Sequence, residues 1–435
     1  MIMRLKGRER AIAALVLIGI GMGISYIVPS EQRIASVATS YPAQICPAFS
    51  SAGSTTASLP AKKLGIRFVD GKSATFKRTS LSQISLGRNA LLIDSNPGSS
   101  LIFSNLASSG IAATTCGAGN PDEWFIGGSG GLTSKGHLGL VNSGLGESIV
   151  DIFPFTSKQP LAKVSVKVKA NSSVTLALDA LAPGEDSMAI HVVTRTGRVS
   201  AFVLDQRAKG LSQLGLDYVK PSATAQTHLV ISGLYPHTSS KSKIASALRL
   251  LAPGSLDASV HVQVVSGDGS FVPVGFDGYQ LRHGSVVTIP LANLTTSSAF
   301  GLIIDSDQPI LASALTATGS HDFAWAAPAP PLTKSSMNFS GNLPTLVFVG
   351  KSISVQVSGR FVTGKSFNQT VSGSDFVAWA PKYGVTSIQL SPLSDSRVFA
   401  GAIFTGGGLT YLPIAQDAVM TNTTLPFNDV HTLTH

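Results

Sequence analysis

The stretch HLGLVNSGLGESIVDIFPF (His137–Phe155) and the later stretch ALRLLAPGSLDASVHVQVV (Ala247–Val265) follow one pattern. In each, an apolar strand leads into a turn of small residues that contains glycine, and a second apolar strand follows. Glycine adopts the positive φ of such turns at low cost. The two stretches therefore predict the same hairpin at two places in the chain, which is the mark of an internal repeat.

The repeat continues beyond the hairpins. Each unit goes on with a third strand, at Ser172–Leu181 and Gly284–Leu294, and then with a strand, a polar turn and a strand. That last pair is predicted at Met188–Asp205 and at Ala299–Ala317, where DSDQP supplies the polar turn. A degenerate copy is predicted to end at 387–404, and a truncated copy is predicted around 90–108.

The strands themselves alternate in polarity. LAKVSVKVK (Leu161–Lys169) places valines on one face and mostly lysines on the other, which is typical of a half-buried strand. A sheet with one apolar face must be covered by another sheet. The sequence therefore predicts an all-β fold of tandem immunoglobulin-like antiparallel β-sandwich modules after a single N-terminal transmembrane helix. The predicted segments are a basic flank and signal anchor (1–30), an N-terminal β module (31–120), three β-sandwich modules (121–222, 223–332, 333–421) and a tail (422–435).

The N-terminus indicates the location. Ala11–Ser30 is an uncharged run of 20 residues preceded by basic residues, so we expect a signal anchor that leaves the C-terminal part outside the cytoplasm. Cleavage of this segment, which would give a secreted protein, is the alternative. In an oxidising compartment the two cysteines of the chain, Cys46 and Cys116, are expected to form a disulfide.

Composition excludes several classes of protein. The chain has 435 residues, 13% of them charged, and a net charge of +9 that is scattered rather than clustered, so we expect no nucleic-acid partner. The 43 glycines have no period of three, which excludes collagen. We expect no metal site, because no metal-ligand motif occurs, and no cofactor.

Several motifs match the letters of known functional sites but lack the neighbouring secondary structure that those sites need. GRFVTGKS (Gly359–Ser366) has the letters of a phosphate-binding loop but no helix-forming sequence after it, so a hairpin loop is predicted. GGSGG (Gly127–Gly131) has the letters of a nucleophile elbow, which leaves a serine hydrolase centred on Ser129 as an alternative. Asp322, beside Trp325, is interpreted as a local capping residue. Trp124 and Trp325 are expected in the core or rim, or alternatively as stacking platforms for a sugar.

Some segments resemble a known family. They are ICP at Cys46-Pro47, EWFIGGS after Cys116, GRVSAFVLDQR, GLDYV and HDFAWAAPAPPL. Together these resemble an uncharacterised actinobacterial family of exported, membrane-anchored proteins, a domain of unknown function built from tandem β-sandwich modules. The resemblance implies a location and an architecture, and it implies no activity.

These observations predict a non-enzymatic, membrane-anchored extracytoplasmic protein of the cell envelope, whose modules are structural or mediate interactions. Its expected partners are the membrane, through the N-terminal helix, and either an envelope polysaccharide or another envelope protein. A polysaccharide-binding protein is the first alternative function, and the serine hydrolase is the second.

Overall fold

The computed structural model describes residues 15–16, 37–40, 42–49, 53–60, 63–71, 75–94, 100–106, 110–222, 224–236, 245–291, 298–318, 322–339, 341–416 and 420–423. The predicted anchor at Ala11–Ser30, apart from Leu15 and Val16, lies outside these residues, as does the tail beyond Thr423. Within the described part of the chain, no helix has the length and apolar character needed to cross a membrane.

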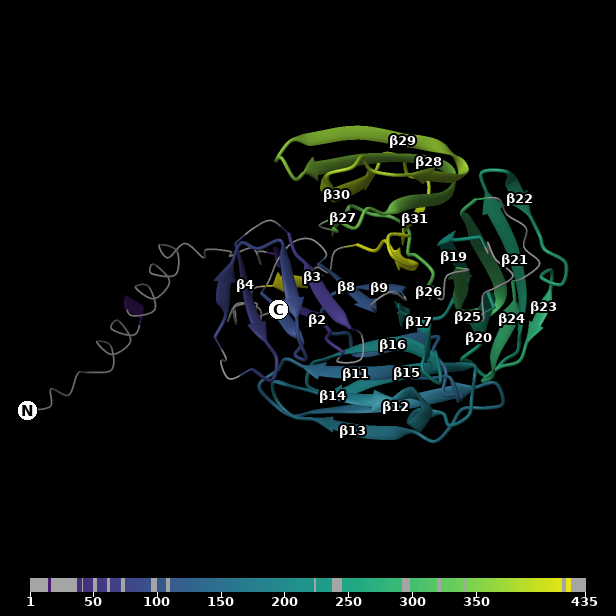
Figure 1. The fold of residues 1–435 in the computed structure, drawn as a ribbon, viewed down its shortest axis with the longest axis horizontal. Coiled ribbons are helices and arrows are strands. Elements are labelled where there is room, and N and C mark those ends of the chain that lie inside the picture. Colours follow the sequence, from purple (N-terminus) through teal and green to yellow (C-terminus); the bar gives the residue numbers. More distant parts are fainter. Residues whose placement is uncertain are drawn as a thin grey trace, which may run out of the picture. The chain divides into compact units, whose positions relative to one another are not determined.

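The fold is all-β, which confirms the class predicted from the sequence. The named strands of the described residues pair in antiparallel sheets, and the one helix named there, α2 (Leu178–Leu181), is a single turn (Figure 1). Residues 41–419 form one compact unit, and residues 1–40 with 420–435 form a second. In the second unit, β1 (Val37–Ser40) pairs with β33 (Met420–Thr423), so that Val37 lies opposite Thr423.

The first two sheets of the large unit each have four strands, in the orders β2-β7-β4-β5 and β6-β3-β8-β9. Their bounds are β2 (Gln44–Cys46), β3 (Ser54–Ser58), β4 (Leu64–Phe68), β5 (Lys77–Thr79), β6 (Gln83–Leu86), β7 (Leu91–Ile93), β8 (Leu101–Leu106) and β9 (Gly110–Thr115). Buried residues of both sheets, among them Leu91 and Ile102, share one apolar core. That core also takes in Phe202 and Tyr218 from the next part of the chain.

Residues 122–222 build a five-stranded sheet, β13-β12-β15-β10-β18, and a four-stranded sheet, β14-β11-β16-β17. The bounds are β10 (Asp122–Ile126), β11 (His137–Asn142), β12 (Ser148–Thr156), β13 (Val164–Val168), β14 (Ser172–Ala177), β15 (Met188–Thr196), β16 (Val199–Lys209), β17 (Ser212–Val219) and β18 (Pro221–Ser222). Val150 and Ile190 of the first sheet pack with Leu140 and Val203 of the second. The alternation predicted from the sequence therefore buries one face of each sheet. The predicted hairpin at His137–Phe155 is wrong, because β11 and β12 belong to different sheets, so the glycine turn between them carries the chain from one sheet to the other.

Residues 226–326 form an eight-stranded arrangement around one long strand, β25 (Phe300–Thr318). The other strands are β19 (Gln226–Leu234), β20 (Ala247–Leu251), β21 (Ala258–Ser266), β22 (Gly269–Phe271), β23 (Tyr279–Leu281), β24 (Val286–Pro290) and β26 (Asp322–Ala326). Residues 300–306 of β25 pair with β21, whereas residues 311–315 pair with β20. The expected turn at DSDQP is thus wrong, because the strand continues through these residues and changes pairing partners there.

Residues 335–413 form a six-stranded sheet around β28 (Thr345–Phe361). The other strands are β27 (Ser335–Asn338), β29 (Ser366–Trp379), β30 (Val385–Pro392), β31 (Phe399–Phe404) and β32 (Thr410–Pro413). GRFVTGKS forms the turn between β28 and β29, where the Phe361 N–H donates to the Lys365 carbonyl at 2.8 Å. A strand follows this loop instead of the helix that a phosphate-binding loop needs.

Candidate functional site

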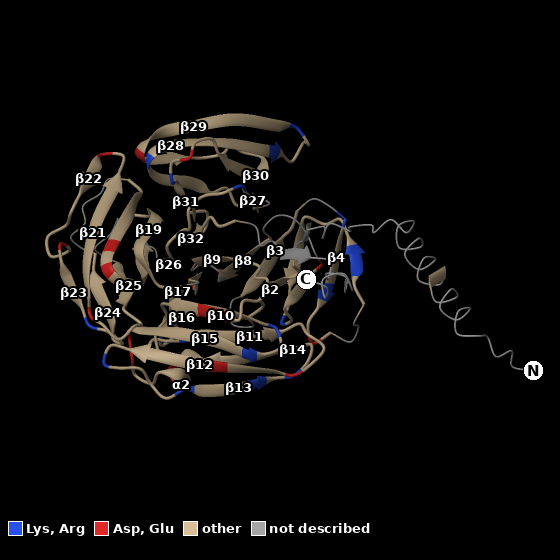
Figure 2. Ribbon diagram, turned by 180° about the vertical axis from the view of Figure 1, so that it is seen from behind, with Lys and Arg blue, Asp and Glu red and all other residues tan. Residues whose placement is uncertain are grey.

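Each predicted module has, at or near its C-terminal end, a strand that lies at the edge of its sheet. These strands are β9, β17, β26 and β32, and each has one ladder partner among the described strands. These four edge strands lie against one another (Figure 2), and we call this region the edge-strand junction. An edge strand carries backbone N–H groups without ladder partners, and burying them without other partners is costly.

Asp322, the first residue of β26, supplies partners for three of these N–H groups. Its Oδ2 accepts the N–H of Ile111 in β9 at 3.1 Å and the N–H of Leu409, just before β32, at 2.8 Å. Its Oδ1 accepts the N–H of Leu216 in β17 at 3.3 Å. One carboxylate therefore connects its own strand to the three others, all by non-local bonds.

Glycines make room for this carboxylate. A Cβ added at Gly110 would lie 2.4 Å from Asp322 Oδ1, and one added at Gly408 would lie 2.3 Å from Asp322 Oδ2. Both distances are below any tolerable contact, so the backbones of β9 and of the turn before β32 can approach Asp322 only because no side chain is present there.

Asp217 of β17 forms a second set of contacts between the same strands. Its Oδ2 accepts the Trp325 N–H of β26 at 2.7 Å and pairs with Lys220 Nζ at 2.5 Å. Its Oδ1 accepts the Thr410 hydroxyl of β32 at 2.7 Å. Thr410 Oγ1 in turn accepts the Ala113 N–H of β9 at 3.0 Å. The second set thus also involves all four strands.

A third carboxylate connects the junction to its surroundings. Asp205 Oδ2 accepts the indole N–H of Trp325 at 2.9 Å and pairs with Arg207 at 2.8 Å. The guanidinium of Arg249 lies 4.9 Å from the centre of the Trp325 ring. Arg249 also donates to the carbonyl of Gly128 at 2.6 Å, which places the GGSGG segment against this cluster.

Burial determines the charge state of the junction. It raises the pKa of Asp322 to about 8, although the N–H groups of Leu409 and Ile111 act in the opposite direction. Burial raises the pKa of Asp217 to about 6, with the Lys220 ammonium opposing the rise. Burial likewise lowers the pKa of Lys220, and Asp217 opposes that change. At neutral pH the Asp217 carboxyl, with its pKa of about 6, is therefore mostly ionised beside Lys220, whereas Asp322, with its pKa of about 8, is mostly protonated.

This arrangement is suited to holding strands together. The carboxylate oxygens of Asp217 and Asp322 face protein donors, and Asp217 and Lys220 are almost fully buried. Among the described residues, no group of three or more His, Cys, Asp or Glu side chains could hold a metal ion. The geometry thus offers a non-local connection between sheets and no open position for a substrate.

Ser129 does not lie in a nucleophile elbow. It is 2% exposed, its hydroxyl accepts the N–H of Gly131 at 3.1 Å, and turn residues rather than a helix follow it before β11. The glycines beside it have a packing role. A Cβ at Gly130 would lie 1.9 Å from the Ala182 carbonyl oxygen, and one at Gly131 would lie 1.9 Å from Asp186 Oδ1.

The two tryptophans have different surroundings. Trp325 is 1% exposed and its ring belongs to the core, so the expectation of a sugar-stacking platform does not hold for Trp325. Trp124 of β10 is half-buried, and its ring stacks on His191 with centroids 3.9 Å apart and an angle of 5° between the planes. A ligand-stacking role for Trp124 stays a prediction.

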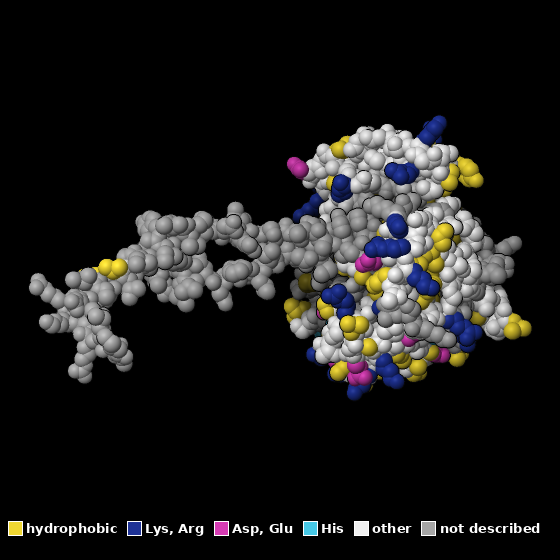
Figure 3. All heavy atoms as spheres, turned by 90° about the vertical axis from the view of Figure 1, so that its left-hand side faces the viewer, with side chains coloured by type: hydrophobic (Ala, Val, Ile, Leu, Met, Phe, Trp, Pro, Cys, Tyr) yellow, Lys and Arg dark blue, Asp and Glu magenta, His cyan; other side chains and the backbone are white. Residues whose placement is uncertain are grey.

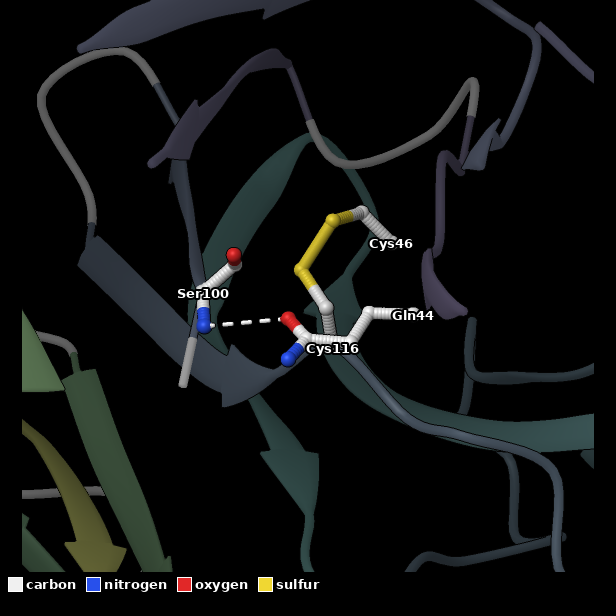
Figure 4. The surroundings of a disulfide bond; sticks show 4 residues. All are labelled: Gln44, Cys46, Ser100 and Cys116. Carbon is white, nitrogen blue, oxygen red and sulfur yellow. Dashed lines mark hydrogen bonds between the residues drawn. A yellow bond between two sulfur atoms is a disulfide. The ribbon is translucent and has the colours of Figure 1, made fainter. Parts of the chain in front are cut away.

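The two cysteines, Cys46 and Cys116, form a disulfide (Figure 4). Cys46 ends β2 and Cys116 directly follows β9. Beside them the Ser100 N–H donates to Gln44 Oε1 at 3.2 Å (Figure 4). The bond therefore links the first strand of this part of the chain to the strand that enters the edge-strand junction.

Sequence reasoning missed most of the junction. Lys220 lies close to the predicted boundary between the modules 121–222 and 223–332, yet its side chain is buried against Asp217. Asp322 was expected to cap its own neighbourhood, whereas it accepts N–H groups from other strands. The available signal was a carboxylate within the short apolar segments GLDYV and DFAWA, since a buried carboxylate needs partners.

Comparison with known proteins gives one family. No curated protein matches the sequence. A solved structure described as a tetra-tandem repeat in the extending region of a large adhesion protein aligns with 11% identity over 87% of this chain and 98% of that chain, at a TM-score of 0.11, which is too low to support an argument. A family described as being of unknown function matches residues 104–371, more than half of the 435 residues and including β17 and β26 of the junction. The chain therefore belongs to this family of unknown function, DUF5719.

Proposed function

We propose that this protein is a non-enzymatic scaffold of the cell envelope, anchored in the membrane by its N-terminal helix and exposed on the extracytoplasmic side. Its immunoglobulin-like sandwich modules serve as structural or interaction units. The uncharged run at Ala11–Ser30 supports the anchor, and the Cys46–Cys116 disulfide fits an oxidising compartment.

The edge-strand junction is the observation that carries the scaffold role. Domains in tandem usually have small interfaces and move relative to one another. Here the carboxylates of Asp217 and Asp322 each bond to several edge strands. Such bonds favour a rigid body that presents its outer sheet faces in fixed positions, which is useful to a scaffold.

The hydrolase alternative has less support. A serine nucleophile needs an exposed hydroxyl and an adjacent base, and Ser129 is buried with its hydroxyl bonded to Gly131.

Protease treatment of intact spheroplasts tests the proposed location. The full chain with a C-terminal epitope should lose the epitope when protease is added outside, while a cytoplasmic control protein survives. Protection of the epitope until the cells are lysed would refute the extracytoplasmic location. Labelling of the full chain by a fluorophosphonate, abolished by Ser129→Ala, would refute the non-enzymatic role.

A further inference from the structure

The outer face of the sheet formed by β27, β28, β29 and β30 is made of uncharged polar side chains. Its inner face packs Val355, Val357 and Leu390 into a core. Because side chains alternate across a strand, the residues between these point outward. Thr370, Gln356 and Ser391 lie side by side in one row across the strands, and Asn368, Ser358 and Gln389 form the next row. We call these six residues the polar face.

The polar face carries almost no charge. Arg360, in the row after Ser358, is the one charged residue in these rows. Figure 2 shows the strands of this sheet mostly in the colour of uncharged residues, with basic residues toward the β28–β29 turn. In Figure 3, where the left-hand side of Figure 1 faces the viewer, the upper part of the surface is mostly white and carries a few basic side chains in dark blue.

The corresponding sheet of residues 122–222 is different, which makes it an internal comparison. On its outer side, Asp151 pairs with Lys163 at 3.1 Å and with Arg195 at 2.8 Å. Charges of this kind are a common way to keep a solvated sheet face soluble. Their replacement by hydroxyl and amide groups on the polar face sets that face apart within the same chain.

Hydroxyl and amide groups both donate and accept hydrogen bonds. Rows on a sheet repeat at about 7 Å along the strands and about 5 Å across them, so the polar face offers these groups in a regular, rigid array. A polymer that repeats hydroxyl groups and carries no charge has the matching chemistry. A polyanion could pair with one cation only, Arg360, and an apolar protein surface would meet no apolar side chains on the polar face.

We propose that the polar face binds an uncharged polysaccharide of the cell envelope. This inference rests on the scaffold function proposed above and names the class of its partner. The Gln356 and Thr370 side chains make no hydrogen bond within the described chain, which leaves them available to sugar hydroxyls. Without an aromatic platform each contact is weak, so affinity depends on many repeats of the polymer engaging at once.

Affinity electrophoresis of the full chain in mild detergent tests the proposal. Native gels contain mannan, dextran or arabinogalactan, with alginate as an anionic comparison. We expect at least one neutral polymer to slow the wild-type protein. The double variant Gln356→Lys/Gln389→Lys should lose the effect by about tenfold in apparent affinity, since two amides that both donate and accept are replaced by charged groups that only donate. Gln226→Lys, the same change on exposed β19, is the matched control and should behave as wild type.

Three results of the gel experiment would overturn the proposal. They are unaltered migration in all neutral polymers, equal retardation of the double variant and the wild type, and retardation by alginate alone. Sedimentation velocity tests whether a second copy of the chain covers the polar face instead. A dimer of the wild type that the double variant abolishes would show this, and it would also overturn the proposal. Circular dichroism confirms that each variant is folded. The spheroplast assay is independent, so a correctly located protein that binds no polymer refutes only this inference.

Discussion

Replacing Asp217 with asparagine leaves the buried ammonium of Lys220 with no anion beside it. Asp217 is the ion-pair partner of Lys220 at 2.5 Å, and both side chains are almost inaccessible to solvent. The new amide also presents N–H donors where the Trp325 N–H and the Thr410 hydroxyl now find an acceptor. Removing one partner of a buried pair typically costs about 3–5 kcal/mol.

The magnitude is a large part of the stability of a domain, which is about 5–15 kcal/mol. The Asp217→Asn variant should therefore unfold at a clearly lower urea concentration, with an unchanged dependence on urea if the transition remains two-state. The assay is urea unfolding of the full chain in mild detergent at pH 7.5, followed by circular dichroism and tryptophan fluorescence.

The double variant Asp217→Asn/Lys220→Met separates charge from packing. It removes the unpaired ammonium and keeps an unbranched side chain of similar length, so we expect it to recover about 2 kcal/mol relative to the single variant. A single variant that loses less than about 1 kcal/mol, or a double variant less stable than the single one, would refute the view that the junction holds a buried ion pair.

The remaining predictions concern Asp322, the glycines and the disulfide. The pKa of Asp322 is raised to about 8 in the folded protein, so its contribution to stability is greatest in acid and is lost as the pH rises toward 8. Between pH 5 and 8 the free energy of unfolding of the wild type should therefore fall with pH. In Asp322→Asn this fall should be smaller by about 1 kcal/mol per pH unit. An equal slope in both proteins would contradict this. Gly408→Ala places a Cβ 2.3 Å from Asp322 Oδ2 and should lower the free energy of unfolding in urea by about 2 kcal/mol or more. Gly406→Ala is the control and should cost little, because its added Cβ has no atom within 4 Å. Similar urea midpoints for the two variants would argue against the close approach at Gly408. Replacing both cysteines with serine opens a loop closed across 70 positions and should cost about 4 kcal/mol in calorimetry under oxidising conditions; unchanged unfolding would show that the bond does not constrain the unfolded chain.

The fold class could be read from local signals. Alternating valines in LAKVSVKVK and glycine turns in the two repeated stretches predict strands, because side-chain period and turn geometry depend on neighbouring residues. The predicted hairpins are wrong, because β11 does not pair with β12, nor β20 with β21. The disulfide between Cys46 and Cys116 could be predicted because the chain has two cysteines, which allow one intrachain pairing, and the two are bonded. At 305–309, however, polar residues and a proline mark a change of pairing partner in β25 rather than a turn.

The contacts of the edge-strand junction could not be predicted from local sequence signals. Asp322 accepts the N–H of Ile111, 211 positions earlier, and no local period reports a contact of that span. Lys220 lies close to a predicted module boundary, but its environment is determined by Asp217 and by Thr410, which lies 190 positions later. Burial of Trp325 likewise follows from the sheets that surround it, and not from its own segment.

The edge-strand junction also limits how this chain can evolve. Open arrays of repeats gain or lose units easily, because each unit contacts only its neighbours. Here the edge strands of the four predicted modules are connected to one another through Asp322, Asp217 or Thr410. A gene duplication or deletion of one module would leave a buried N–H or carboxylate without a counterpart, so we expect members of this family to keep the same number of modules.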